Sequence, residues 1–65
     1  MKNRRGKSIE DRLNEDIEYA AGVANNEHRE ILAIKALGAA DLAVEFNLIT
    51  YAQWETVINR IFNLM

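Results

Sequence analysis

The side chains in this chain that could do acid–base or metal chemistry are its carboxylates and its single histidine. Among 65 residues there are ten Asp and Glu residues, one histidine (His28) and no cysteine. His28 has no second histidine or cysteine to complete a metal site. It also has no serine or cysteine nucleophile nearby in the sequence that it could activate. We therefore expect no enzymatic activity, no metal and no cofactor.

Three of the carboxylates share a spacing that would place them on one helical face. Asp11, Glu15 and Glu18 are separated by four and three residues, and side chains at these separations project together from a helix. Such a face could attract a basic partner or imitate nucleic-acid phosphates. The alternative is a solvated helix face without a partner. We keep all three as candidate partner-binding residues.

The basic residues are concentrated at the N-terminal end. Lys2, Arg4, Arg5 and Lys7 fall within the first seven residues, which contain no acid. Residues 8–65 hold all ten acids against four bases, so they carry a net charge of −6. We predict a flexible basic arm over residues 1–7, which could contact nucleic acid without sequence specificity. The alternative is a solubilising tail.

The clearest sequence signals for secondary structure lie near the C-terminal end. Thr50 and Gln53 have the spacing of a capping box, and Ile49 and Trp54 have that of a hydrophobic staple. The apolar side chains that follow fall on one helical face and predict an amphipathic helix over about residues 51–64. These residues are Tyr51, Trp54, Val57, Ile58, Ile61, Phe62 and Met65.

Two further helices are predicted upstream. Ser8 is a plausible N-cap for a helix over about residues 9–24, and a second helix is predicted over about residues 27–46. Asn25-Asn26 predicts the turn between them, although one continuous helix through this pair remains an alternative. The second helix is apolar nearly all round, which is typical of a buried helix. Asn47 is expected to end it.

These elements predict an all-α fold, with a single three-helix domain over residues 8–65. We expect an antiparallel helical hairpin with the C-terminal amphipathic helix packed across it. Two short helices cannot cover every side of helix 27–46, so apolar surface should remain uncovered. A homodimer is one way to cover it.

Composition also bears on location. The longest apolar stretch, residues 31–48, is interrupted by Lys35, Asp41 and Glu45, so we expect no membrane span. No apolar segment directly follows the basic N-terminal residues, so we expect no signal peptide. The chain has no cysteine, which fits a reducing compartment. We therefore expect a cytoplasmic protein.

The segment Leu48-Ile49-Thr50, followed by Trp54, resembles the turn of the SHOCT domain, a short helical module. That family has a Gly-hydrophobic-Ile-Thr turn and a Glu-Phe pair in the next helix. Here Asn47 stands at the glycine position and Gln53-Trp54 replaces Glu-Phe. Because helix capping alone accounts for the pattern, we do not assign the chain to this family. In general character the chain also resembles small acidic regulators from phages and mobile elements.

The expected function is that of a small non-catalytic protein–protein interaction module, acting as a regulator, adaptor or inhibitor. Tyr51, Phe62 and Trp54 are the candidate anchors, since aromatic residues often dominate binding energy. Trp54 is also half of the predicted staple and so a core candidate. One alternative is a nucleic-acid-associated regulator that uses Lys2, Arg4, Arg5 and Lys7. The other is a purely structural homo-oligomerisation domain.

Overall fold

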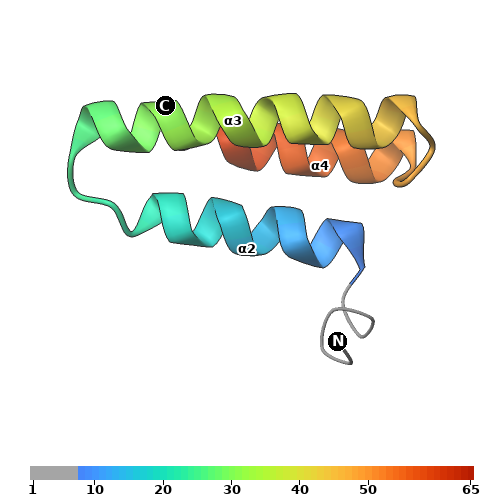
Figure 1. The fold of residues 1–65 in the computed structure, drawn as a ribbon, viewed down its shortest axis with the longest axis horizontal. Helices are drawn as coiled ribbons and strands as arrows, with labels where there is room; N and C mark the ends of the chain where they lie inside the picture. The colour runs from blue at the N-terminus through green and yellow to red at the C-terminus, as the bar shows by residue number, and fades with distance from the viewer. Residues whose placement is uncertain (1–7) are drawn as a thin grey trace.

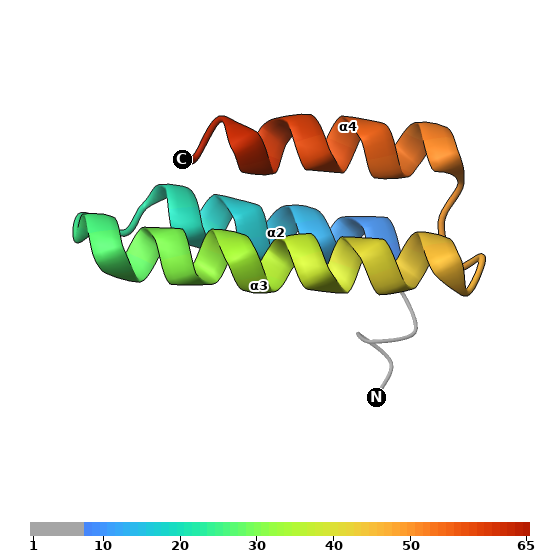
Figure 2. The same cartoon turned by 90° about the horizontal axis from the view of Figure 1, so that it is seen from above.

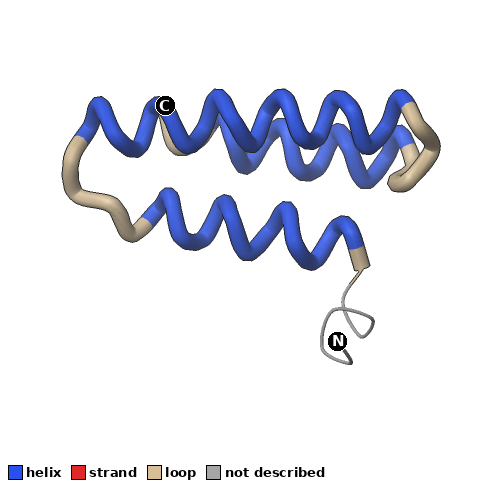
Figure 3. The backbone as a smooth tube through the Cα atoms, in the orientation of Figure 1, coloured by secondary structure: helices blue, strands red, loops and turns tan. Residues whose placement is uncertain are grey.

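The computed structural model describes residues 8–65, which form three α-helices and no strand (Figures 1 and 3). Helix α2 spans Ile9–Ala21, α3 spans Asn26–Glu45 and α4 spans Tyr51–Phe62. The predicted all-α class with three helices is confirmed. The predicted arm, residues 1–7, lies outside the described residues.

The three helices pack against one another in pairs, and each contacts the other two. The chain runs along α2, returns along α3 and reverses again in α4, so successive helices are antiparallel (Figure 1). Figure 2 shows α4 on one side of the α2–α3 pair. The three helices thus pack together, and α4 runs alongside α3 rather than across the hairpin.

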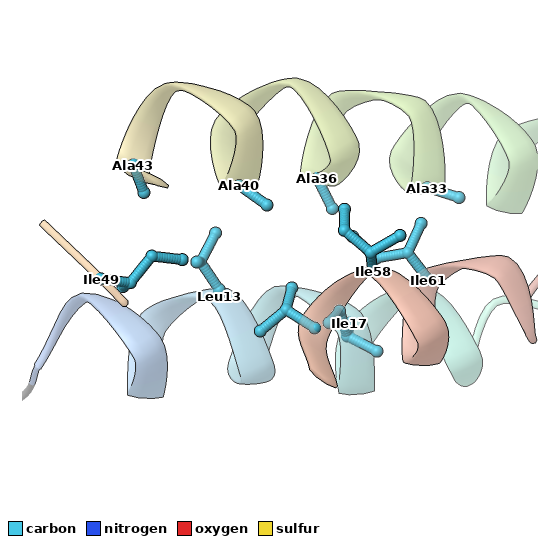
Figure 4. Close-up of a cluster of buried hydrophobic side chains, with 10 residues drawn as sticks. Leu13, Ile17, Ala33, Ala36, Ala40, Ala43, Ile49, Ile58 and Ile61 are labelled. Carbon is cyan, nitrogen blue, oxygen red and sulfur yellow. The ribbon is translucent and has the colours of Figure 1, made fainter. Parts of the chain in front are cut away.

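The core combines a small-residue face of α3 with larger side chains from α2 and α4 (Figure 4). The buried residues of α3 are all alanines, namely Ala33, Ala36, Ala40 and Ala43. Opposite them, the buried residues of α2 and α4 and of the turn before α4 are mostly branched aliphatics: Leu13, Ile17, Ile49, Val57, Ile58 and Ile61. Small side chains let helix backbones approach closely, and large ones fill the space between them.

Helix α2 ends three residues earlier than its predicted end at Ala24. Gly22 caps it: the Gly22 N–H donates to the Tyr19 carbonyl and the Val23 N–H to the Ala20 carbonyl, each at 3.1 Å. The Val23 carbonyl instead accepts a hydrogen bond of 2.9 Å from Nη1 of Arg29, whose Nε donates to the Leu64 carbonyl at 3.3 Å. A further Arg29 nitrogen donates to Asn26. One guanidinium therefore joins the α2–α3 loop, the first turn of α3 and the segment after α4.

The other boundaries lie close to those predicted. Asn25 is the N-cap of α3, and its side chain accepts the His28 backbone N–H at 2.8 Å, so the Asn pair separates two helices. Helix α3 ends at Glu45 and α4 at Phe62, one and two residues before the predicted ends. Differences of this size are usual where helix ends fray.

The turn from α3 to α4 is a Schellman motif. Asn47 has φ 61°, in the left-handed region. Its N–H donates to Val44 O at 3.1 Å, and the Leu48 N–H donates to Ala43 O at 2.8 Å. These two bonds satisfy carbonyls that the end of the helix would leave unpaired.

The predicted capping box is present at the start of α4. Thr50 Oγ1 accepts the Gln53 N–H at 3.0 Å, and Gln53 Oε1 accepts the Thr50 N–H at 2.7 Å. Ile49 is buried in the core cluster, and Trp54 packs against that cluster. Together with the Schellman turn, this cap fixes where α4 starts, and hence where its aromatic residues lie.

We expect alanine and glycine at position 47 to have different effects on the free energy of unfolding. Asn47→Ala should lower the free energy of unfolding by about 1 kcal/mol, because a Cβ without a polar group is strained at positive φ. Asn47→Gly should leave it unchanged or raise it by up to about 1 kcal/mol. Urea unfolding followed by circular dichroism, at one fixed protein concentration, would measure both. An alanine variant as stable as the glycine variant would contradict the left-handed turn.

The capping box can be tested with a matched pair of threonines. Thr50→Ala should cost about 1 kcal/mol, because it leaves the Gln53 N–H without its acceptor. Thr56 is exposed in the middle of α4 and donates to Ala52 O at 3.1 Å, so Thr56→Ala should change stability by less than about 0.5 kcal/mol. Equal losses in the two variants, in the same urea experiment, would argue against the cap.

Candidate functional site

The packing of α3 buries four alanines and leaves several of its large apolar side chains exposed. While its four buried residues are alanines, Ile31, Ile34, Leu42 and Phe46 are 54%, 56%, 55% and 68% exposed. A helix that packed only within its own domain would be expected to bury its largest apolar side chains. The outer side of α3 is therefore the most unusual surface of the described structure.

Part of this outer surface lines an apolar groove between α2 and α3, here called the α2–α3 groove. Its volume is about 390 Å³, and none of its lining residues belongs to α4. Leu48, in the turn after α3, is 59% exposed and also lines the groove. The lining residues are Ile9, Arg12, Leu13, Asp16, Ala39, Leu42, Ala43, Phe46 and Leu48. Apart from one base and one acid, all are apolar.

A second apolar surface lies along α4, at the predicted aromatic anchors. Tyr51 is 68% and Phe62 54% exposed. Trp54 is half-buried against the core, and its indole Nε1–H donates to Asp41 Oδ1 at 2.9 Å. The Tyr51 and Trp54 rings lie 5.0 Å apart at 32°. The structure thus assigns Trp54 a part in joining α4 to α3 and leaves Tyr51 and Phe62 accessible; binding by these residues stays a prediction.

The three predicted carboxylates share one exposed face of α2. Asp11, Glu15 and Glu18 are exposed and, with Asn14, line a shallow depression of about 250 Å³. Asn14 Oδ1 accepts a hydrogen bond from Arg60 of α4. Within residues 8–65, no group of three or more His, Asp or Glu side chains is arranged to hold a metal ion. This acidic face shares no residue with the α2–α3 groove.

The residues of the nucleic-acid alternative cannot be placed in this way. Lys2, Arg4, Arg5 and Lys7 fall outside the described residues. Residues 8–65 carry more acids than bases, and a surface without positive excess attracts phosphates poorly. That alternative therefore depends entirely on the first seven residues.

Sequence reasoning missed the groove and the role of Arg29. The apolar excess of helix 27–46 did signal an uncovered surface, but a helix that is apolar all round does not indicate which face its neighbours leave free. Ile9, the first residue of α2, is 37% exposed at the groove. No signal in the sequence pointed to the three-way contact of Arg29.

Among the described helices, none is long and apolar enough to cross a membrane. Comparison with protein-family models found no match to this chain, and neither the curated proteins nor the solved structures that were searched gave a match. The assignment of function therefore rests on the surfaces described above.

Proposed function

We propose that this chain is a small non-catalytic protein–protein interaction domain that docks through apolar helical surfaces. The observation that carries the proposal is the number of large apolar side chains left in contact with solvent. Ten of them, within residues 8–65, are between 37% and 68% exposed. Monomeric proteins seldom leave extended apolar patches uncovered, and such patches usually mark an interaction site.

For a heterologous partner, we propose docking on the edge of α4. Tyr51 and Phe62 are large, accessible aromatic residues, and side chains of this type commonly dominate the energy of protein interfaces. Both stand on one helix, which starts at the capping box and packs on the core through Val57, Ile58 and Ile61, so the backbone that carries them is ordered before binding. Preorganised anchors lose less conformational entropy when a partner binds.

The acidic face of α2 would add electrostatic selection. Asp11, Glu15 and Glu18 are exposed together, and a patch of one sign accelerates encounters with partners of the opposite sign. A partner with a basic surface beside an apolar one would be favoured. Such a domain could serve as a regulator, adaptor or inhibitor. The absence of cysteine supports placing this activity in the cytoplasm.

Replacing the α4 anchors should weaken partner binding without unfolding the domain. With the full chain as bait, we expect Tyr51→Ala and Phe62→Ala each to reduce capture of a specific partner by about tenfold or more. Glu55→Ala, at an exposed position of the same helix, is the control and should have little effect. Quantitative affinity capture, with circular dichroism to confirm helicity, makes the comparison. If the wild-type chain and all three variants capture the same protein equally well, docking through α4 is contradicted.

The nucleic-acid alternative can be separated by deleting residues 1–7. We expect the shortened chain to capture its protein partner as well as the full chain does, because the proposed anchors are intact. The full chain should give no more than a weak gel shift that disappears with added salt. A strong shift that depends on residues 1–7, with no protein partner captured, would favour nucleic-acid association over our proposal.

A further inference from the structure

The α2–α3 groove needs an occupant that matches both its shape and its charge. Leu42 and Phe46 form its apolar wall on α3, and both are more than half exposed. The groove lies between the two helices that run side by side in Figure 1, and α4 contributes nothing to it. The groove is therefore an apolar surface that the packing of α4 leaves uncovered.

We propose that a second copy of this chain covers the α2–α3 groove, so that two copies form a twofold dimer. The inference rests on the proposed interaction function and names one partner for it. In a twofold contact the same surface patch of both copies is used. If one residue of the first copy contacts a second residue of its partner, the same two residues also meet in the reverse order. A patch that is self-complementary in charge is suited to such a contact.

The charges at the groove meet this condition. Arg12 and Asp16 are its only charged lining residues, and they are four residues apart on α2. Among residues 8–65, neither side chain forms a hydrogen bond or an ion pair with another residue. A twofold axis that crosses α2 between them places Arg12 of one copy opposite Asp16 of the other, and the reverse pair forms at the same time. The groove has no net charge, so a polyanion or a strongly basic segment would gain nothing there.

The available area also fits a dimer. The broad face of the molecule, which Figure 1 views directly, measures 31 by 26 Å. A standard protein interface buries about 800 Å² on each partner, and a face of this size can supply that area. Small domains are also marginal in stability when alone, and association is a common way to bury more apolar surface. Dimerisation through the groove would leave Tyr51, Phe62 and the acidic face free for another partner.

The first test uses two matched substitutions and sedimentation equilibrium between about 1 and 100 μM, a range in which a modest dimer assembles. The wild-type chain should approach twice 7.4 kDa as its concentration rises. Leu42→Glu should weaken dimerisation by about 100-fold or more, because it places a charge in the contact of both copies. Thr56→Glu is the control, because it adds the same charge at an exposed position of α4 that lies outside the groove and is not a proposed anchor. It should dimerise normally.

The second test examines the reciprocal charge pair. Arg12→Asp alone and Asp16→Arg alone should each weaken self-association by about tenfold, because like charges then face each other. Mixed in equal amounts, the two variants should form a dimer with each other, since the acidic positions of one face the basic positions of the other. A mixture that remains monomeric overturns the proposed pairing.

Other outcomes separate this inference from the proposed function. A wild-type chain that is monomeric throughout, or a dimer that Leu42→Glu leaves intact, overturns the second-copy proposal. If the chain is monomeric and Leu42→Glu instead abolishes capture of another protein, the groove belongs to that protein and the dimer is again excluded. Loss of capture in Tyr51→Ala or Phe62→Ala would still support the proposed function in each of these cases. Circular dichroism of every variant confirms that the helices remain folded.

Discussion

The structure depends on the close approach of two helices to the alanine face of α3. Ala33, Ala36, Ala40 and Ala43 are 0–6% exposed, and the space before them is filled by branched side chains of α2 and α4. Replacing these alanines by larger residues would push the helices apart, since a close-packed core has little room for added volume. The same constraint orients α3 so that Ile31, Ile34, Leu42 and Phe46 lie away from the core and stay exposed.

This orientation connects the fold to the proposed function. A domain of this size has few large apolar side chains with which to form a core. Fully burying one of them contributes roughly 1.5–3 kcal/mol to stability, relative to leaving it exposed. Leu42, Phe46 and Ile34 all forgo much of that burial in the isolated chain. Covering them by another polypeptide would recover it. We therefore regard the outer side of α3 as an interface that the isolated chain leaves uncovered.

Local signals in the sequence predicted the local structure well. Thr50 with Gln53, Asn47 and Asn25 each mark a helix end, because their side chains or backbone conformations act within a few residues. The number and type of the elements followed from these signals. The end of α2 was misplaced: Gly22 caps the helix, and the Val23 carbonyl bonds Arg29, which also reaches Leu64 O, 35 residues further along the chain. Short-range patterns contain no information about that contact.

The surfaces were predicted less completely. The shared face of Asp11, Glu15 and Glu18 followed from helical spacing, and Tyr51 and Phe62, chosen as candidate anchors, are exposed. The α2–α3 groove could not be located, because α3 has apolar residues in every direction and the positions of both α2 and α4 decide which of them are covered.

The central claim is that the large apolar side chains on the outside of α3 are covered by another polypeptide when the protein associates. Methyl NMR with a soluble paramagnetic agent measures this directly, residue by residue, at low and high protein concentration. We predict that the buried methyls of Leu13 and Ile17 are protected at both concentrations, and that those of Leu42 are protected only at the high one. If the Leu42 methyls stay equally accessible at both concentrations and after addition of any captured partner, the account is contradicted.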